Sequence, residues 1–448
     1  MADQTSNPSR IGFQYYPDTQ HYREHDLHSW LPELQSLGAG KLVLYAHPER
    51  AIPEQFIAGL IAGGIEPILH IQLPLPSPNR LPSLELLAES YARWGVRYAV
   101  LFDRPNIRQT WAPSAWTQSE VVEQFLDMYI PLAERMLQSG LMPVFPPLEP
   151  GGDYWDTTFL QAALRSLQRR GCTALLDSLT MSALAWTHDK PLDWGAGGPE
   201  RWPLSYPYST PPGSQDQRGF HIFEWYLQIT ASELGTSRPI ILLRTGVAPQ
   251  AHAPQTDVQH HVESSLAIAR ALAVPAGDGG LSIPVEVLAC NFWLLAAAPE
   301  SPYANQAWVQ PDGGRLPSAT ALRRWNSGRM AATSHAEQAQ STPASESQAT
   351  PMAAHAAQTV TSAPRPITHY LLVPLYAWGI AEWDMESIRP IIDKFHPTVG
   401  FSIEEACLAD RVTIAGGSKA FSEADYQRLR DAGCNLEILE TGGNLVAV

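Results

Sequence analysis

The sequence predicts an α/β fold: a closed (β/α)8 barrel, or TIM barrel, followed by a linker and a small second α/β domain. Three observations predict it. The chain has 448 residues, more than one domain usually holds. Over roughly the first 330 residues, eight short apolar segments alternate with amphipathic stretches, as in a parallel sheet covered by helices. A long stretch poor in apolar residues then precedes a shorter region with the same alternation.

The expected barrel strands are near-continuous apolar runs, a pattern typical of strands buried on both faces. They cover 11–16, 41–46, 66–73, 97–103, 141–146, 173–179, 239–244 and 285–293. Between them, residues such as Val121, Phe125 and Leu132 recur at helical spacing. Gly140 then supplies a helix stop. Eight such units predict a closed barrel; a doubly wound open sheet is the alternative, but no GxGxxG follows the first strand.

The domain boundaries follow from composition. The barrel is expected over 1–327. Residues 328–366 are rich in Ala, Ser, Thr, Pro and Gln, with Val360 as the only branched aliphatic residue. Such a segment buries too little apolar surface to offset its ordering entropy, so we expect a disordered linker. Residues 367–448 combine short strands and helical stretches and predict a small α/β domain.

Bulk composition limits the partners and the location. The formal net charge of −15 argues against nucleic acid and against an anionic membrane, because both need a clustered basic surface. The N-terminus shows no readable signal peptide and no apolar run is long enough to span a bilayer, so we expect a cytoplasmic protein, with secretion left open. Cys172, Cys290, Cys407 and Cys434 show no metal-binding spacing, so we expect free thiols and neither a metal nor a cofactor.

Candidate site residues are read from the C-terminal ends of the strands, where barrels of this type carry their function. The ends of the expected strands hold Tyr15, His70, Asp103, Arg104, Asn106, Glu149, Arg244, Asn291 and Trp293. In the following loops, Trp155 and Trp194 could stack on sugar rings, although a long loop packing against itself explains each equally well. A metal bound by His47, His70 and Glu49 is less favoured than histidines hydrogen-bonded in the barrel mouth.

Two short motifs, LFDRPN at 101–106 and IILLRTGV at 240–247, carry a resemblance. Over about residues 10–327 the chain resembles the large clan of glycoside hydrolases with (β/α)8 barrels. In that clan an acid/base glutamate ends strand four in a W-N-E-P motif, and a nucleophilic glutamate ends strand seven in a T-E-x-G motif. Asp103 and Arg104 stand here in place of the Asn and the acid/base Glu. Leu243 and Arg244 stand in place of the Thr and the nucleophile, so the resemblance implies that arginine replaces both catalytic glutamates.

This replacement has a chemical consequence. Retaining hydrolysis needs two carboxyl groups about 5 Å apart, and a guanidinium with a pKa above about 12 can replace neither. Two arginines in one cleft suggest either a site for an anion or pairing with local acids such as Asp103, Glu149, Asp153 and Glu224. We therefore expect a non-hydrolytic protein that binds a carbohydrate or a small anionic ligand, with Arg104 and Arg244 holding the charged group.

Two alternatives remain open at the level of sequence. The first is an active, inverting hydrolase that uses Asp103 and Glu149, since inverting enzymes tolerate carboxyl separations of about 6.5–9.5 Å. It would be favoured if neither acid were tied to an arginine. The second is an inert barrel that serves as a scaffold while the linker and the tail recruit partners.

The C-terminal region carries a second resemblance. Residues 411–443 resemble the repeat unit of bacterial cell-wall-binding modules: a strand, Gly416 and Gly417, a Ser-led helix, a short strand and a closing glycine. This implies a bacterial source and a cell-wall polymer as partner, although a simple turn explains the two glycines better, and the missing signal peptide conflicts with export. Ser422, with Asp425 three positions on, predicts a helix N-cap.

Overall fold

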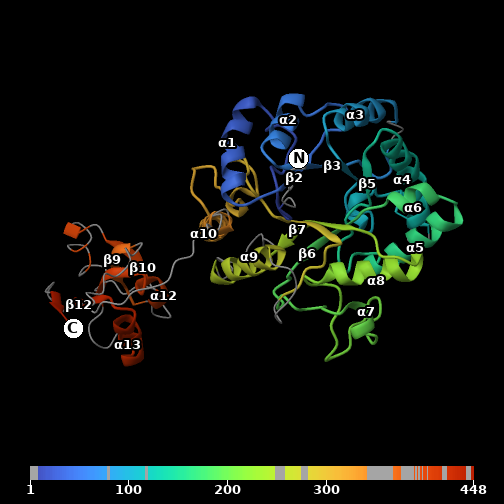
Figure 1. The fold of residues 1–448 in the computed structure, drawn as a ribbon. Coiled ribbons are helices and arrows are strands. Elements are labelled where there is room, and N and C mark those ends of the chain that lie inside the picture. The colour runs from blue at the N-terminus through green and yellow to red at the C-terminus, as the bar shows by residue number, and fades with distance from the viewer. Residues whose placement is uncertain are drawn as a thin grey trace, which may run out of the picture. The chain divides into compact units, whose positions relative to one another are not determined.

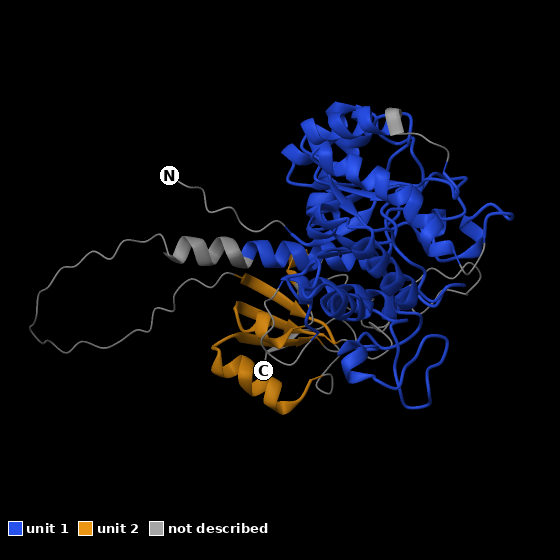
Figure 2. Ribbon diagram, turned by 90° about the vertical axis from the view of Figure 1, so that its right-hand side faces the viewer, with its two compact units in different colours: residues 1–343 blue, residues 344–448 orange. Residues whose placement is uncertain are grey.

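The computed structural model describes residues 9–77, 81–116, 120–247, 258–273, 281–340, 367–374, 388, 391, 394–395, 397–400, 402–415, 421–439 and 445–447. The chain divides into two compact units, residues 1–343 and 344–448, which Figure 2 shows in different colours. Each unit is described by itself.

Unit 1 is an eight-stranded parallel barrel. The strands are β1 (Ile11–Gln14), β2 (Lys41–Tyr45), β3 (Glu66–Ile71), β4 (Tyr98–Leu101), β5 (Met142–Val144), β6 (Met181–Trp186), β7 (Ile240–Gly246) and β8 (Val287–Phe292), paired in the order β5-β4-β3-β2-β1-β8-β7-β6. The two end strands meet at a parallel bridge between Val144 and Thr180, where the Phe145 N–H donates to the Thr180 carbonyl at 2.8 Å. The predicted closed barrel is confirmed.

Helices surround the barrel (Figure 1). They are α1 (Glu24–Ser36), α2 (Glu54–Ala62), α3 (Leu81–Arg93), α4 (Val121–Gln138), α5 (Asp156–Arg169), α6 (Thr173–Ser178), α7 (Gly198–Arg201), α8 (Ile222–Leu234), α9 (Val258–Ala273) and α10 (Pro317–Gln340), with 3-10 turns at Arg108–Thr110 and Ala304–Gln306. Outward-facing strand residues such as Phe13 and Leu42 pack against these helices. Inward-facing residues such as Val43, Ile68 and Ile241 fill the barrel, so the strands are buried on both faces.

The sixth strand lies elsewhere than predicted. Residues 173–178 form the short helix α6, which is followed at once by strand β6 at 181–186. The predicted segment TALLDSL is rich in Ala and Leu, which favour helix, and has no Val or Ile to favour strand. Trp186 ends strand β6.

Helix α10 extends into the predicted linker. It runs to Gln340, so residues 328–340 are helical where we expected disorder. Low hydrophobicity misled the prediction, because Ala, Met, Glu and Gln in this stretch are good helix formers even without a core to cover. The rest of the predicted linker, 341–366, lies outside the described residues.

Unit 2 contains a five-stranded sheet in the order β10-β9-β11-β12-β13. Its elements are β9 (Ile367–Leu372), β10 (Thr398–Gly400), α12 (Ile403–Ala406), β11 (Ala409–Ile414), α13 (Glu423–Asp431), β12 (Asn435–Leu439) and β13 (Leu445–Ala447), and only β13 is antiparallel to its neighbour. Ser422 Oγ accepts from the Asp425 N–H, and Asp425 accepts from the Ser422 N–H, as the N-cap prediction requires. Gly416, Gly417, Gly442 and Gly443, which carry the repeat resemblance, lie outside the described residues.

Two further features concern the chain as a whole. The four cysteines are thiols, and three of them, Cys172, Cys290 and Cys434, are buried. Among the described residues, no helix combines the length and the apolar character that crossing a bilayer requires.

Candidate functional site

The candidate site is the barrel mouth, defined here by seven side chains at the C-terminal ends of the strands. They are Tyr45, His70, Asp103, Arg104, Glu149, Arg244 and Trp293. Alternation along each strand sets the inward positions: Val43 on β2 and Ile68 on β3 lie inside the barrel, so the residues two further on, Tyr45 and His70, point the same way at the mouth.

A sharp turn after β4 presents Asp103 and Arg104. Phe102 has φ 67° and Arg104 has φ 44°, both in the left-handed region that side-chain-bearing residues rarely adopt. The Phe102 ring packs outward against Phe125 in the core, and the Arg104 N–H donates to the Pro147 carbonyl at 3.0 Å. The core and the neighbouring loop thus hold a strained turn, a feature that clusters at functional sites.

Arg104 is paired with two carboxylates. Its Nε donates to Oδ2 of Asp103 at 2.9 Å, and its Nη1 donates to Oε2 of Glu149 at 3.3 Å. The side chain of Asp103 is 12% exposed, and that of Glu149 is 32% exposed. One guanidinium therefore contacts one strand-four acid and one acid from the loop after β5.

Arg244 enters the mouth from β7 through a break in register. The β7–β8 ladder shifts between Leu242 and Thr245, and Leu243 still belongs to the barrel interior. The Nη2 atom of Arg244 donates to the Tyr45 hydroxyl at 2.7 Å and lies 3.9 Å from Oδ1 of Asp103. Its guanidinium carbon also lies 4.9 Å from the centre of the Trp293 ring, a cation–π contact.

Burial and pairing set the protonation states at the mouth. Burial raises the pKa of Asp103, but Arg244 and Arg104 outweigh it, and the pKa ends below its ordinary value. Burial lowers the pKa of His70 to about 4, so its imidazole is neutral at neutral pH. Two arginines then face Asp103 and Glu149, and the mouth carries no net charge from these five side chains.

Asn106 supports the mouth from below and is not open to a ligand. It is fully buried, its Nδ2 donates to the carbonyls of Glu149 and Tyr154 at 2.9 and 3.0 Å, and its Oδ1 accepts from the Glu149 N–H at 2.8 Å. The predicted ligand-binding role does not fit this arrangement, because all three contacts go to the chain itself. Asn106 instead fixes the loop that carries Glu149.

Tyr15 and Asn291 are both fully buried. Tyr15 lies among Tyr22, Trp30 and Phe56 in the layer outside the barrel, as alternation along the strand from the outward-facing Phe13 requires. Asn291 follows the inward-facing Ala289 by two residues and therefore faces the barrel interior, where it donates to the Leu242 carbonyl at 2.8 Å.

The two predicted stacking residues lie in different surroundings. Trp155 is 7% exposed, with Tyr208 at a ring distance of 5.2 Å on one side and Arg218 5.3 Å from its ring. Trp194 donates from Nε1 to Asp216 at 3.2 Å and carries Lys190 at 4.3 Å over its ring. Both rings are largely engaged by the long β6–α8 loop and its neighbours.

One residue of the site was missed in the sequence. Tyr45 ends β2, where the prediction looked instead at His47 and Glu49; the alternation of Lys41, Val43 and Tyr45 was the signal that could have found it. The pairing of Arg104 with Asp103 and Glu149 matches one of the two interpretations that the sequence offered for the arginines. Within the described part of the chain, no group of three or more His, Cys, Asp and Glu side chains is arranged to hold a metal ion.

Comparisons with known proteins were made for the whole chain. No protein-family model matches it, and no curated protein matches it. Similar solved structures include a monomeric β-xylosidase from Caulobacter crescentus CB15, with 14% identity, TM-score 0.44, and coverage of 71% of this chain and 68% of that one. A family 39 glycoside hydrolase from Bacteroides cellulosilyticus WH2 has 12% identity and TM-score 0.46, and the match covers 71% of this chain and 63% of that one.

A β-galactosidase from Marinomonas ef1 has 10% identity and TM-score 0.43, and the match covers 96% of this chain and 75% of that one. This chain therefore spans less than two thirds of the Bacteroides hydrolase and somewhat more of the other two. All three similar proteins are glycoside hydrolases with barrel folds. At these identities and TM-scores the similarity assigns neither a family nor an activity to this chain.

Proposed function

We propose that unit 1 is a non-hydrolytic carbohydrate-binding barrel that holds an uncharged sugar ring in the mouth. The observation that carries this proposal is the double pairing of Arg104 with Asp103 and Glu149, at 2.9 and 3.3 Å. These are the two acids that the alternative, active hydrolase would have to use. Both acids are hydrogen-bonded to Arg104, and this arrangement disfavours hydrolysis by these two carboxyl groups.

The acid chemistry supports the same conclusion. A general acid must hold a proton near neutral pH, whereas the pKa of Asp103 lies below its ordinary value because Arg244 and Arg104 outweigh its burial. A nucleophile or base needs a free carboxylate, whereas Glu149 faces the Arg104 guanidinium. Hydrolysis by this pair would need Asp103 to hold a proton beside the charges of Arg244 and Arg104.

The charge balance favours an uncharged ligand over an anion in the mouth. Two guanidiniums are already matched by two carboxylates, so an incoming anion would have to displace one of them. The mouth still has polar groups that can bond to the hydroxyls of a sugar. Arg244 uses only Nη2 toward Tyr45, which leaves guanidinium donors for sugar hydroxyls. Oδ1 of Asp103 is buried without a hydrogen bond in the described structure, so it accepts from a hydroxyl only when a bound sugar displaces the side chains that cover it.

The proposal is tested by measuring binding of neutral oligosaccharides to the full chain by isothermal titration calorimetry. Asp103→Asn removes the negative charge of the side chain at nearly constant shape, and Arg244→Met removes the guanidinium donors. Each substitution should weaken the affinity for the oligosaccharide about tenfold or more, as expected when a charged hydrogen bond to a ligand is lost. Asp127→Asn, on the outer helix α4 with a 67% exposed side chain, is the matched control. Equal affinities for all four proteins, or no binding to any neutral sugar, would overturn the proposal.

A further inference from the structure

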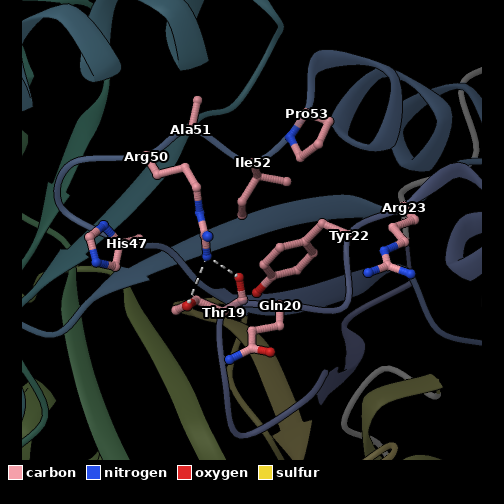
Figure 3. A pocket seen from close by; sticks show the side chains of 9 residues that line it. All are labelled: Thr19, Gln20, Tyr22, Arg23, His47, Arg50, Ala51, Ile52 and Pro53. Carbon is pink, nitrogen blue, oxygen red and sulfur yellow. Dashed lines mark hydrogen bonds between the residues drawn. The ribbon is translucent and has the colours of Figure 1, made fainter.

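A pocket beside the mouth has a different chemistry from the mouth itself. We propose that it binds the oxyanion substituent of a sugar, a carboxylate or a sulfate; the inference rests on the proposed function for the neighbouring ring. The pocket has a volume of about 340 Å³, within the range of about 300–1,000 Å³ typical of small-molecule sites. Figure 3 shows it between the loop after β1 and the loop after β2.

The lining is cationic. Arg23 and Arg50 are among the residues that line the pocket, and no Asp or Glu is. Two of the nearby acids are hydrogen-bonded to other groups: Asp18 accepts from the His21 ring at 2.8 Å, and Asp26 accepts from the Arg23 backbone N–H at 2.8 Å. In a chain with a formal net charge of −15, two guanidiniums without a carboxylate at one cavity indicate an anionic ligand.

Hydrogen bonds to Thr19 orient the Arg50 side chain in the pocket. Its Nη2 donates to the carbonyl and the hydroxyl of Thr19 at 2.9 and 3.4 Å, the dashed lines in Figure 3. Its Nε and Nη1 donate to no residue within the described structure. A guanidinium fixed at one end presents its remaining donors in the planar arrangement that matches carboxylate and sulfate oxygens.

His47 adds a donor on another side of the pocket. The Glu49 N–H donates to Nδ1 of His47 at 3.1 Å, so the neutral ring carries its proton on Nε2. Tyr22 and Ile52 supply apolar wall between the polar groups (Figure 3). Such a mixture of apolar wall and a few donors suits a sugar ring with one charged substituent.

The pocket is connected to the mouth by direct contacts. The Tyr22 hydroxyl donates to the Tyr45 carbonyl at 2.7 Å, and the Tyr45 hydroxyl accepts from Arg244 at 2.7 Å. His47 follows Tyr45 by two residues, a span of about 7 Å in extended chain. These contacts make the pocket and the mouth neighbours within unit 1, and we place the charged substituent of the saccharide in the pocket.

The first experiment needs no ligand in the mouth. Binding of D-glucuronate, D-glucose 6-sulfate and D-glucose to the full chain is measured by saturation-transfer NMR at low salt. We expect one of the two anions, or both, to bind at least tenfold more tightly than glucose, and Arg50→Gln to abolish that preference. Comparing D-glucuronate with D-glucose 6-sulfate shows whether the pocket recognises a carboxylate or a sulfate. Equal binding of all three sugars would overturn the inference.

Matched variants separate this inference from the proposed function. Arg169→Gln, which removes the same charge from a 65% exposed side chain on outer helix α5, should keep the preference. Arg50→Lys, which keeps the charge without the planar fork, should bind with intermediate affinity. If Arg50→Gln keeps the preference while its thermal unfolding matches the parent, the pocket assignment is wrong. If the preference depends on Arg50 but no neutral sugar binds, the pocket stands and the proposed function fails.

Discussion

Asp103 and Arg104 are consecutive in the chain, yet Nε of Arg104 donates to Oδ2 of Asp103 at 2.9 Å. The turn that allows this contact has two residues with positive φ, Phe102 and Arg104. The same guanidinium reaches Glu149, so a single cation pairs with both of the acids best placed for hydrolysis. This relationship accounts for an arginine at a position where the resemblance implies a glutamate.

Removing Arg104 should cost stability. In Arg104→Ala, Asp103 and Glu149 lose a shared partner, and we expect about 2 kcal/mol less free energy of unfolding, below the value for fully buried pairs because the Arg104 side chain is 30% exposed. Urea denaturation followed by tryptophan fluorescence measures the change. Adding Asp103→Asn should recover about half of the loss, since one unpaired charge is then gone. A double variant as unstable as the sum of the two single variants would show that the pair is not coupled.

Asn106 should act on stability rather than on contact with a ligand. Asn106→Ala leaves two carbonyls and one N–H of the Glu149 loop without partners, and we expect a loss of about 2–4 kcal/mol. Asn305→Ala, at an exposed position in a surface turn, is the control and should change the free energy of unfolding by less than about 0.5 kcal/mol. A stable Asn106→Ala protein that loses only sugar binding would restore the ligand-binding role predicted from the sequence.

Asp156 should make stability depend on pH. Burial raises its pKa to about 6, although Gly151, Gln217 and Tyr226 all hydrogen-bond to its carboxyl group. The unfolded pKa is about 3.9, so the stabilising contribution is complete below about pH 4 and is lost as the pH rises through 6. Asp156→Asn cannot ionise, so its stability relative to the parent should increase by up to roughly 3 kcal/mol between pH 4 and pH 8. A stability difference that is constant across this range would contradict the assignment.

Asp216 should hold the long loop between β6 and α8. It is 1% exposed, and Arg218, Thr210 and Trp194 donate to its carboxylate. Burial raises its pKa, but these hydrogen bonds outweigh it, so the group stays ionised. Asp216→Ala leaves the donors of Arg218, Thr210 and Trp194 unmatched, and we expect a loss of about 2 kcal/mol, below the value for a fully buried pair because the Arg218 side chain is 41% exposed.

Limited trypsin digestion tests the local effect of Asp216→Ala, because Lys190, Arg201 and Arg218 lie in or beside this loop. Cleavage there should become about tenfold faster than in the parent, as local opening becomes easier by more than about 1.4 kcal/mol. Asp312→Ala, in an exposed turn, is the control. Unchanged cleavage with lowered global stability would show that Asp216 stabilises the barrel and not the loop.

Seven of the eight barrel strands could be read from the sequence, because parallel strands buried on both faces are continuous apolar runs. The sixth could not, since an Ala/Leu-rich helix and an Ala/Leu-rich strand follow one another there. Arg104 and Arg244 were placed at the mouth from their positions at the ends of strands. Asp103 and Glu149 were among the candidate partners of these arginines, but the choice between the candidates was not readable. The contacts depend on the turn at Phe102 and on the register shift in β7, which carry no motif.

The most direct test of the central claim is turnover measured beside binding on one set of ligands. Aryl glycosides and polysaccharides are incubated with the full chain, with Asp103→Asn and with Glu149→Gln, and released sugar and bound ligand are both quantified. The account predicts binding of a neutral saccharide without turnover, and weaker binding in Asp103→Asn. Hydrolysis by the parent chain that either substitution abolishes would contradict it and would make Asp103 and Glu149 a working catalytic pair.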